Sequence, residues 1–146
     1  MAEVRGCNIP EDLYYWPEKH VWASPQEDGS VKVGVTDVAQ HMAKTIISAL
    51  PKAAGKSTKK GRSLGTIESG KWVGPVTSPL TGEIAETNPT LSSDPSVINR
   101  DPYEEGWFVR ISPADWEGES ADLVTGADGV AAYEAFLESE GITCES

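Results

Sequence analysis

Turn-forming residues interrupt the apolar segments of this chain at short intervals. Its 146 residues include 14 glycines and 10 prolines, and many of these directly follow a run of alternating apolar side chains. This spacing leaves room for strands of roughly four to eight residues and for few long helices. No apolar run approaches the roughly 18 residues that a membrane span needs. The pattern therefore predicts an antiparallel β protein without membrane insertion.

The N-terminal half predicts a β-hairpin around the turn at residues 26–30. Aromatic and apolar residues over 14–23 precede that turn, and alternating residues over 31–35 follow it. An Asp-Gly pair between two such segments is a strong hairpin signal. Further short strands are predicted at residues 46–50, 64–68, 72–76, 82–86 and 107–111.

Helices are predicted only between or after these strands. Asp37 can cap a short helix over residues 38–43, and residues 94–99 favour a single helical turn. The final helix is expected over residues 129–140, with Asp128 as its cap and Gly141 at its end. The predicted fold class is mainly β with peripheral helices, including one at the C-terminus.

The N-terminal segment over residues 1–12 is expected to be a loose lead-in. Residues 13–146 are expected to form a single domain. The N-terminus lacks the basic, apolar and small-residue order of a signal peptide, which predicts a cytoplasmic protein.

Charge is strongly acidic overall but unevenly distributed. The formal net charge of −11 opposes sequence-independent binding to nucleic acid or anionic lipid. Between Lys44 and Arg62, however, there are basic residues and no acidic ones. This basic band is either a solvated loop or a docking patch for an acidic partner.

Cys7 and Cys144 stand near opposite ends of the chain. Two cysteines are too few for a disulfide scaffold, and their spacing predicts no metal site. Because domain termini often lie close together, they are either idle thiols or a redox-responsive thiol pair.

Signatures of enzymes are absent from the sequence. It has no Gly-x-Ser-x-Gly motif, no glycine-rich phosphate loop and no cluster of His and Cys. His20 is expected to be half-buried and hydrogen-bonded, and His41 to be solvated. The chain is therefore predicted not to be an enzyme.

The segment Glu68-Ser69-Gly70-Lys71-Trp72 is the most informative part of the sequence. A strand reaching Glu68, a tight turn and a second strand from Trp72 would project the amine of Lys71 from a hairpin tip. An amine in that position is accessible to a modifying enzyme. Taken alone, it would be an ordinary solvated charge.

This segment resembles the lysine motif Glu-Ser-Val-Lys-Ala of the lipoyl-carrying H-protein family of the glycine cleavage system. Further matching blocks are Val33-Gly34-Val35-Thr36-Asp37, Ser78-Pro79, Gly82-Glu83, Val97-Ile98-Asn99, Asp101-Pro102-Tyr103, Gly106-Trp107 and Ala132-Tyr133-Glu134-Ala135. The resemblance implies a flattened antiparallel barrel or sandwich, the barrel-sandwich hybrid of lipoyl domains. It also implies lipoate in amide linkage to Lys71, with Glu68, Ser69, Gly70 and Trp72 around the attachment site. Glu68 and Gly70 would flank the lysine for a lipoate-attaching enzyme, although Glu68 is equally consistent with an ordinary charge at a strand end. Dihydrolipoamide dehydrogenase is expected as a further partner.

The sequence also departs from that family. The family's His-Glu-Trp is His20-Val21-Trp22 here, which removes a carboxylate that would suit a cationic aminomethyl cargo. Gly70 and Trp72 replace Val and Ala around the lysine.

The run Gly6–Tyr15 and the Gly-Lys-Trp tip resemble the lipoate-binding proteins of the heterodisulfide-reductase-like system of sulfur-oxidising prokaryotes. That resemblance implies an arm that shuttles sulfur-containing intermediates or electrons to a heterodisulfide-reductase-like complex. The alternative is an H-protein that carries an aminomethyl group in glycine cleavage. A third interpretation is an unmodified interaction module. Biotin carriage is disfavoured because the Met-Lys-Met tip of biotin carriers is absent.

Overall fold

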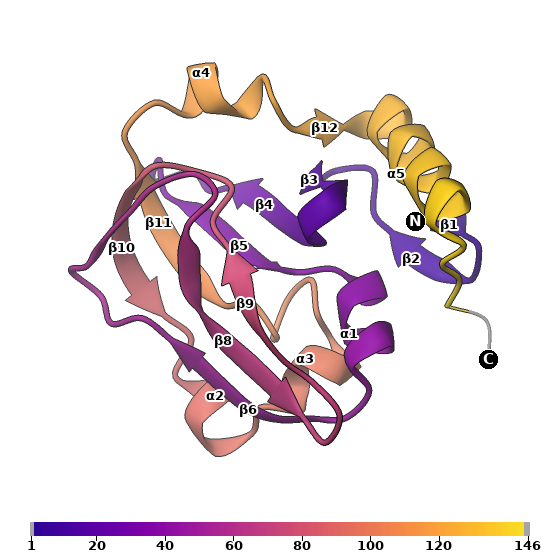
Figure 1. Cartoon of the computed structure of the whole chain (residues 1–146). Helices are drawn as coiled ribbons and strands as arrows, with labels where there is room; N and C mark the ends of the chain where they lie inside the picture. The colour runs from indigo at the N-terminus through magenta and orange to yellow at the C-terminus, as the bar shows by residue number, and fades with distance from the viewer. Residues whose placement is uncertain (1, 145–146) are drawn as a thin grey trace.

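A computed structural model describes residues 2–144 of the chain, and within this part the strands form three antiparallel sheets (Figure 1). The seven-stranded sheet has the order β12 (Val124–Thr125), β3 (Tyr14–Trp16), β4 (Val21–Pro25), β5 (Val31–Val35), β11 (Val109–Pro113), β10 (Gly82–Thr87) and β7 (Ser57–Thr58). The three-stranded sheet has the order β6 (Ile46–Pro51), β8 (Ser63–Ser69) and β9 (Val73–Thr77). The two-stranded sheet pairs β1 (Ala2–Val4) with β2 (Cys7–Ile9).

The main core lies between the seven-stranded and three-stranded sheets. Val33, Ile84 and Ile111 from the larger sheet and Ile67 and Val76 from the smaller one belong to the same cluster of buried side chains. Each is at most 3% exposed. Alternation of buried and exposed residues along β8 and β9 turns one face of each strand toward this core. The predicted fold class, a mainly β sandwich with peripheral helices, is confirmed.

Short helices join the strands, and one longer helix ends the fold. They are the 3₁₀ helix η1 (Pro17–Lys19), α1 (Asp37–Ala43), α2 (Thr90–Ser93), α3 (Val97–Arg100), α4 (Trp116–Ser120) and α5 (Gly126–Glu140). The final helix begins three residues earlier than its predicted start at residue 129, and Gly141 ends it with φ of 67° as expected. Asp128 is therefore in the first turn rather than at the cap, which is Thr125.

Thr36, not Asp37, caps α1. The Thr36 hydroxyl accepts a hydrogen bond from the Ala39 amide at 3.4 Å. The Asp37 carboxylate has other donors, because it accepts bonds from the Asn8 amide at 2.8 Å and the Gln40 side chain at 2.6 Å. Asp37 thereby joins α1 to the N-terminal strands.

The N-terminal segment is not a loose lead-in. β1 and β2 form a hairpin through Arg5 and Gly6, which both have positive φ angles as a tight two-residue turn requires. Cys7 and Ile9 are fully buried, and they belong to a second core cluster that includes Tyr133 and other residues of α5. These short strands therefore cover α5.

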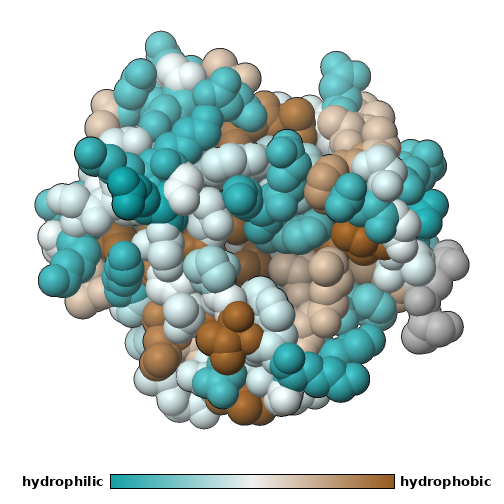
Figure 2. Space-filling model, in the orientation of Figure 1, coloured by the Kyte–Doolittle hydropathy of each residue, from teal (hydrophilic) through white to brown (hydrophobic). Residues whose placement is uncertain are grey.

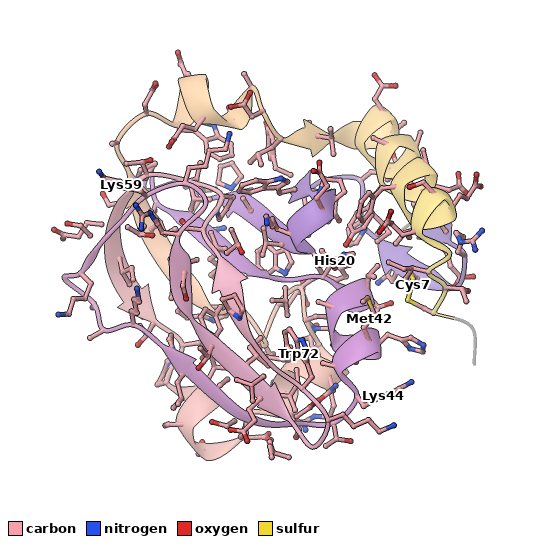
Figure 3. The ribbon with its side chains drawn as sticks, viewed as in Figure 1. Cys7, His20, Met42, Lys44, Lys59 and Trp72 are labelled. Atoms are coloured by element: carbon pink, nitrogen blue, oxygen red, sulfur yellow. A yellow bond between two sulfur atoms is a disulfide. The ribbon has the colours of Figure 1, made fainter. Side chains whose placement is uncertain are left out.

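Cys7 and Cys144 form a disulfide, with Cα atoms 5.0 Å apart. The sequence expectation that the termini approach each other agrees with this geometry, and the interpretation as idle thiols is wrong. The bond joins β2 to the segment that follows α5, as the yellow sulfur bond beside Cys7 in Figure 3 shows. A redox response of this pair stays a prediction.

Candidate functional site

Lys71 is exposed at the turn that joins β8 to β9, as the sequence predicts. The Ser69 amide donates a hydrogen bond to the Trp72 carbonyl at 2.8 Å, and the Lys71 amide donates one to Ser69 Oγ at 3.4 Å. Ser69 itself is only 4% exposed, so the residue that holds the turn through these hydrogen bonds is buried beneath it. None of the ion pairs formed among residues 2–144 includes Lys71. The turn therefore holds the backbone in place and leaves the amine accessible.

Trp72 lies against β9 rather than extending into solvent. A Cβ atom added at Gly74 would lie 2.0 Å from the Trp72 ring, so the ring covers this glycine. Gly74 has no side chain to displace the indole. About half of Trp72 remains exposed, and the ring forms one wall of a pocket beside the hairpin.

That pocket has a volume of about 220 Å³ and lies between α1 and the β8–β9 hairpin. Most of its lining is apolar, and the contributors include Met42, Ala43, Ile46, Ile67, Trp72 and Val76. Lys19 and His20 complete the lining at the end of η1. In Figure 3, the labels of these lining residues lie close together, with His20 above Met42 and Trp72. The volume is below the roughly 300 Å³ at which pockets for drug-sized ligands begin.

His20 joins this pocket to α5. Its φ of 56° places it in the left-handed region, and this turn ends η1 and starts β4. His20 Nδ1 lies 2.6 Å from the Tyr133 hydroxyl, which in turn lies 2.8 Å from the hydroxyl of Thr36. Burial lowers the pKa of His20 to about 4, so the ring is neutral at pH 7. The expectation of a half-buried, hydrogen-bonded histidine is confirmed.

We expect the protein to lose stability between pH 6.5 and pH 4 because of His20. The folded-state pKa of about 4 lies below the ordinary value of 6.5, so the unfolded chain binds a proton first as the pH falls. The corresponding loss of unfolding free energy is at most about 3 kcal/mol. Urea titrations across this range should show a shallower pH dependence for His20→Gln. His41→Gln serves as the control, and an unchanged slope in His20→Gln would contradict the assignment.

The basic band of the sequence does not form a single surface. Lys44 and Lys59 lie at widely separated places in Figure 3. Lys60 forms an ion pair with Asp122 at 2.6 Å and lies 5.5 Å from the centre of the Trp16 ring. The two ends of the band therefore lie apart, and docking of an acidic partner at Lys56, Lys59 and Lys60 stays a prediction.

Hydrophobic side chains gather on the outer face around the three-stranded sheet, as Figure 2 shows. Ile47, Leu50 and Val73 are each more than half exposed there. Val73 pairs with Glu68 across the β8–β9 ladder, so apolar surface directly adjoins the lysine turn. A partner that contacts Lys71 would also meet this apolar surface.

The structure brings together most, but not all, of the residues singled out from the sequence. Glu68, Ser69, Gly70 and Trp72 surround Lys71 in the hairpin, whereas the disulfide belongs to the second core cluster with α5. No sequence pattern predicts the pocket. Its lining comes from η1, β5, α1, β6 and the hairpin, and nothing in the sequence connects these segments.

The site is thus a hairpin of a small β sandwich that presents Lys71, outside the ion pairs formed among residues 2–144, next to a pocket of about 220 Å³. The glycine cleavage H-protein family model matches residues 13–139. The chain belongs to this family, whose members are carriers with lipoate covalently attached to a lysine.

Comparisons with individual proteins agree with this assignment. The chain is 46% identical over 144 residues to glycine cleavage system H protein 2 of Aquifex aeolicus, covering 99% of this chain and 89% of that protein. It is 40% identical to probable glycine cleavage system H protein 2 of Saccharolobus solfataricus, covering 99% of both. The crystal structure of a glycine cleavage system H protein from Mycobacterium marinum superposes with a TM-score of 0.75 at 29% identity, covering 92% of this chain and all of that one.

No helix within residues 2–144 is long and apolar enough to cross a bilayer.

Proposed function

We propose that this chain is a lipoyl carrier whose arm is attached through an amide bond to Lys71. The observation that carries the proposal is the hairpin itself, in which Ser69 fixes the turn while the amine stays exposed and unpaired among the described residues. Lipoate would supply a dithiolane that accepts a group or two electrons. The protein would supply position, because a tethered arm reaches successive partners at high effective concentration.

The neighbouring residues fit such an arm. Trp72 follows the lysine directly and forms a wall of the 220 Å³ pocket, so an arm from Lys71 starts at the pocket's rim. Glu68 and Gly70 are exposed beside the lysine and are available to the lipoate-attaching enzyme. We propose this enzyme and dihydrolipoamide dehydrogenase as partners, and the cytoplasm as the compartment.

The names of the relatives favour glycine cleavage as the pathway. In that case the arm would accept an aminomethyl group from glycine decarboxylase and pass it on. The sulfur-oxidising role that the N-terminal run suggests receives no support from those names. Glycine cleavage is therefore the first candidate.

The lining of the pocket favours the second candidate, a carrier of sulfur-containing intermediates for a heterodisulfide-reductase-like complex. None of the described residues that line the pocket is acidic, whereas an aminomethyl group is a cation at neutral pH. Val21, at the position of the family's glutamate, is 1% exposed and pairs with the pocket residue Val35. The carboxylate is therefore missing from the strand next to the pocket.

Reconstitution separates the two candidates. The fully lipoylated chain is mixed with glycine decarboxylase, and exchange of labelled bicarbonate into glycine is measured beside an established H-protein. Exchange at a similar rate supports glycine cleavage. A rate lower by about tenfold or more, with lipoylation verified by intact mass, supports the sulfur carrier.

A further inference from the structure

The pocket beside Lys71 has an unusual charge balance for an acidic protein. The chain carries 23 acidic and 12 basic residues, yet of the described residues that line the pocket only Lys19 is charged at neutral pH. Lys19 is exposed and takes no part in the ion pairs formed among residues 2–144. Its ammonium is therefore available to a ligand.

Nearby acidic side chains do not offset this charge inside the pocket. Glu68 follows Ile67 on β8, and successive strand side chains point to opposite faces, so Ile67 lines the pocket and Glu68 faces away from it. Asp37 on α1 is outside the lining, and its carboxylate is directed to the Asn8 amide and the Gln40 side chain. Glu18 precedes Lys19 but is exposed and outside the lining.

His20 contributes polarity without charge. Its Nδ1 is engaged by Tyr133, which leaves Nε2 as the ring nitrogen that remains for a ligand. A neutral ring next to a lysine can hydrogen-bond an oxygen atom and adds no charge of its own.

Given the proposed lipoyl arm, we propose that this pocket receives an arm end bearing a small oxoanion, such as a sulfonate, and that Lys19 is the residue that determines this preference. The apolar walls hold the carbon and sulfur atoms of the arm, and Lys19 binds the anion. A cationic arm end gains nothing comparable, because it would leave water for an apolar pocket whose one charged lining residue has the same sign.

Defined arm ends provide the test. One thiol of the reduced lipoyl arm on the full chain is alkylated with 2-bromoethanesulfonate or with 2-bromoethylamine, the thiolate displacing bromide in each case. Peptide mapping verifies a single adduct on the residue-71 peptide and an intact, unalkylated Cys7–Cys144 disulfide. Docking in the pocket is measured as NMR shifts of the Trp72 indole N–H, assigned with a Trp72→Phe variant, and of the Met42 methyl group.

We expect the sulfonate arm to dock more than the ammonium arm in the wild-type chain, by about two- to fivefold for one partly exposed charge pair. Lys19→Glu should reverse this preference. Lys59→Glu makes the same change in net charge far from His20 and should leave the preference unchanged. Equal docking of the two arms, or an equal effect of both substitutions, would overturn the proposal.

A failure of the proposed function gives a different result. In that case the chain never gains a lipoyl group on Lys71, and the arm experiment cannot be assembled. The preference is then measured with free dihydrolipoamide carrying the same sulfonate or ammonium group, titrated into the unmodified chain. Tighter binding of the sulfonate in wild type, lost in Lys19→Glu, supports the pocket assignment, and equal affinities refute it.

Discussion

A Lys71→Arg variant is expected to gain no lipoyl mass when it is incubated with lipoate and a lipoate-attaching enzyme, while the wild-type chain gains one lipoyl group. Amide formation needs a primary amine, and the guanidinium of arginine stays protonated and cannot replace it. Because Lys71 is exposed and outside the ion pairs formed among residues 2–144, the free energy of unfolding should change by less than about 0.5 kcal/mol. Intact mass, peptide mapping and urea denaturation measure both outcomes.

Lys44→Arg is the matched control for this experiment. Lys44 is another exposed lysine, but it follows α1 instead of occupying a hairpin turn. The Lys44→Arg variant should be lipoylated on Lys71 to the same extent as the wild type. A lipoyl group found on another lysine in Lys71→Arg would contradict the assignment of the attachment site.

Cys7→Ser is expected to lower the free energy of unfolding by about 3 to 5 kcal/mol. The disulfide closes a loop with a sequence separation of 137 residues, and long loops lose the most chain entropy when they are cross-linked in the unfolded state. Cys7 is fully buried, so the loss should show as a lower urea midpoint and not merely as a local change. Cys144→Ser should give a similar value, because it removes the same bond.

Counting free thiols tests the disulfide independently of the stability measurement. Thiol titration of the unlipoylated folded chain should find no accessible thiol, and mild reduction should release two. Lys71 should be lipoylated equally before and after reduction, because its hairpin contacts the other sheet and not the disulfide. Two titratable thiols in the untreated native chain would contradict the bond.

Local signals in the sequence predict much of the fold. The Asp-Gly turn and the alternation before and after it predict β4 and β5, and the apolar face of Val130, Tyr133 and Leu137 predicts α5. Gly141 is a correctly predicted end for that helix. These elements each carry their own pattern over several residues, which is why single-sequence reasoning finds them.

The N-terminal hairpin and the pocket lack such local signals. β1 and β2 have three residues each, too few to show a periodic pattern, and their burial depends on α5 at the far end of the chain. Met42 fits the apolar stripe of a short helix, but its position beside Trp72 follows only from the packing of α1 against the hairpin. The lysine hairpin was therefore predictable from a motif, while the pocket beside it was not.

The contact between His20 and Tyr133 also limits how far the domain can be shortened. The pocket residue His20 is held by the hydroxyl of Tyr133 on α5, and α5 is covered by β1 and β2. An excised fragment that keeps the lysine hairpin but omits either end would lose the support behind one pocket wall. Anyone grafting this carrier onto another protein should therefore transplant it from its first strand through Cys144 as one cassette.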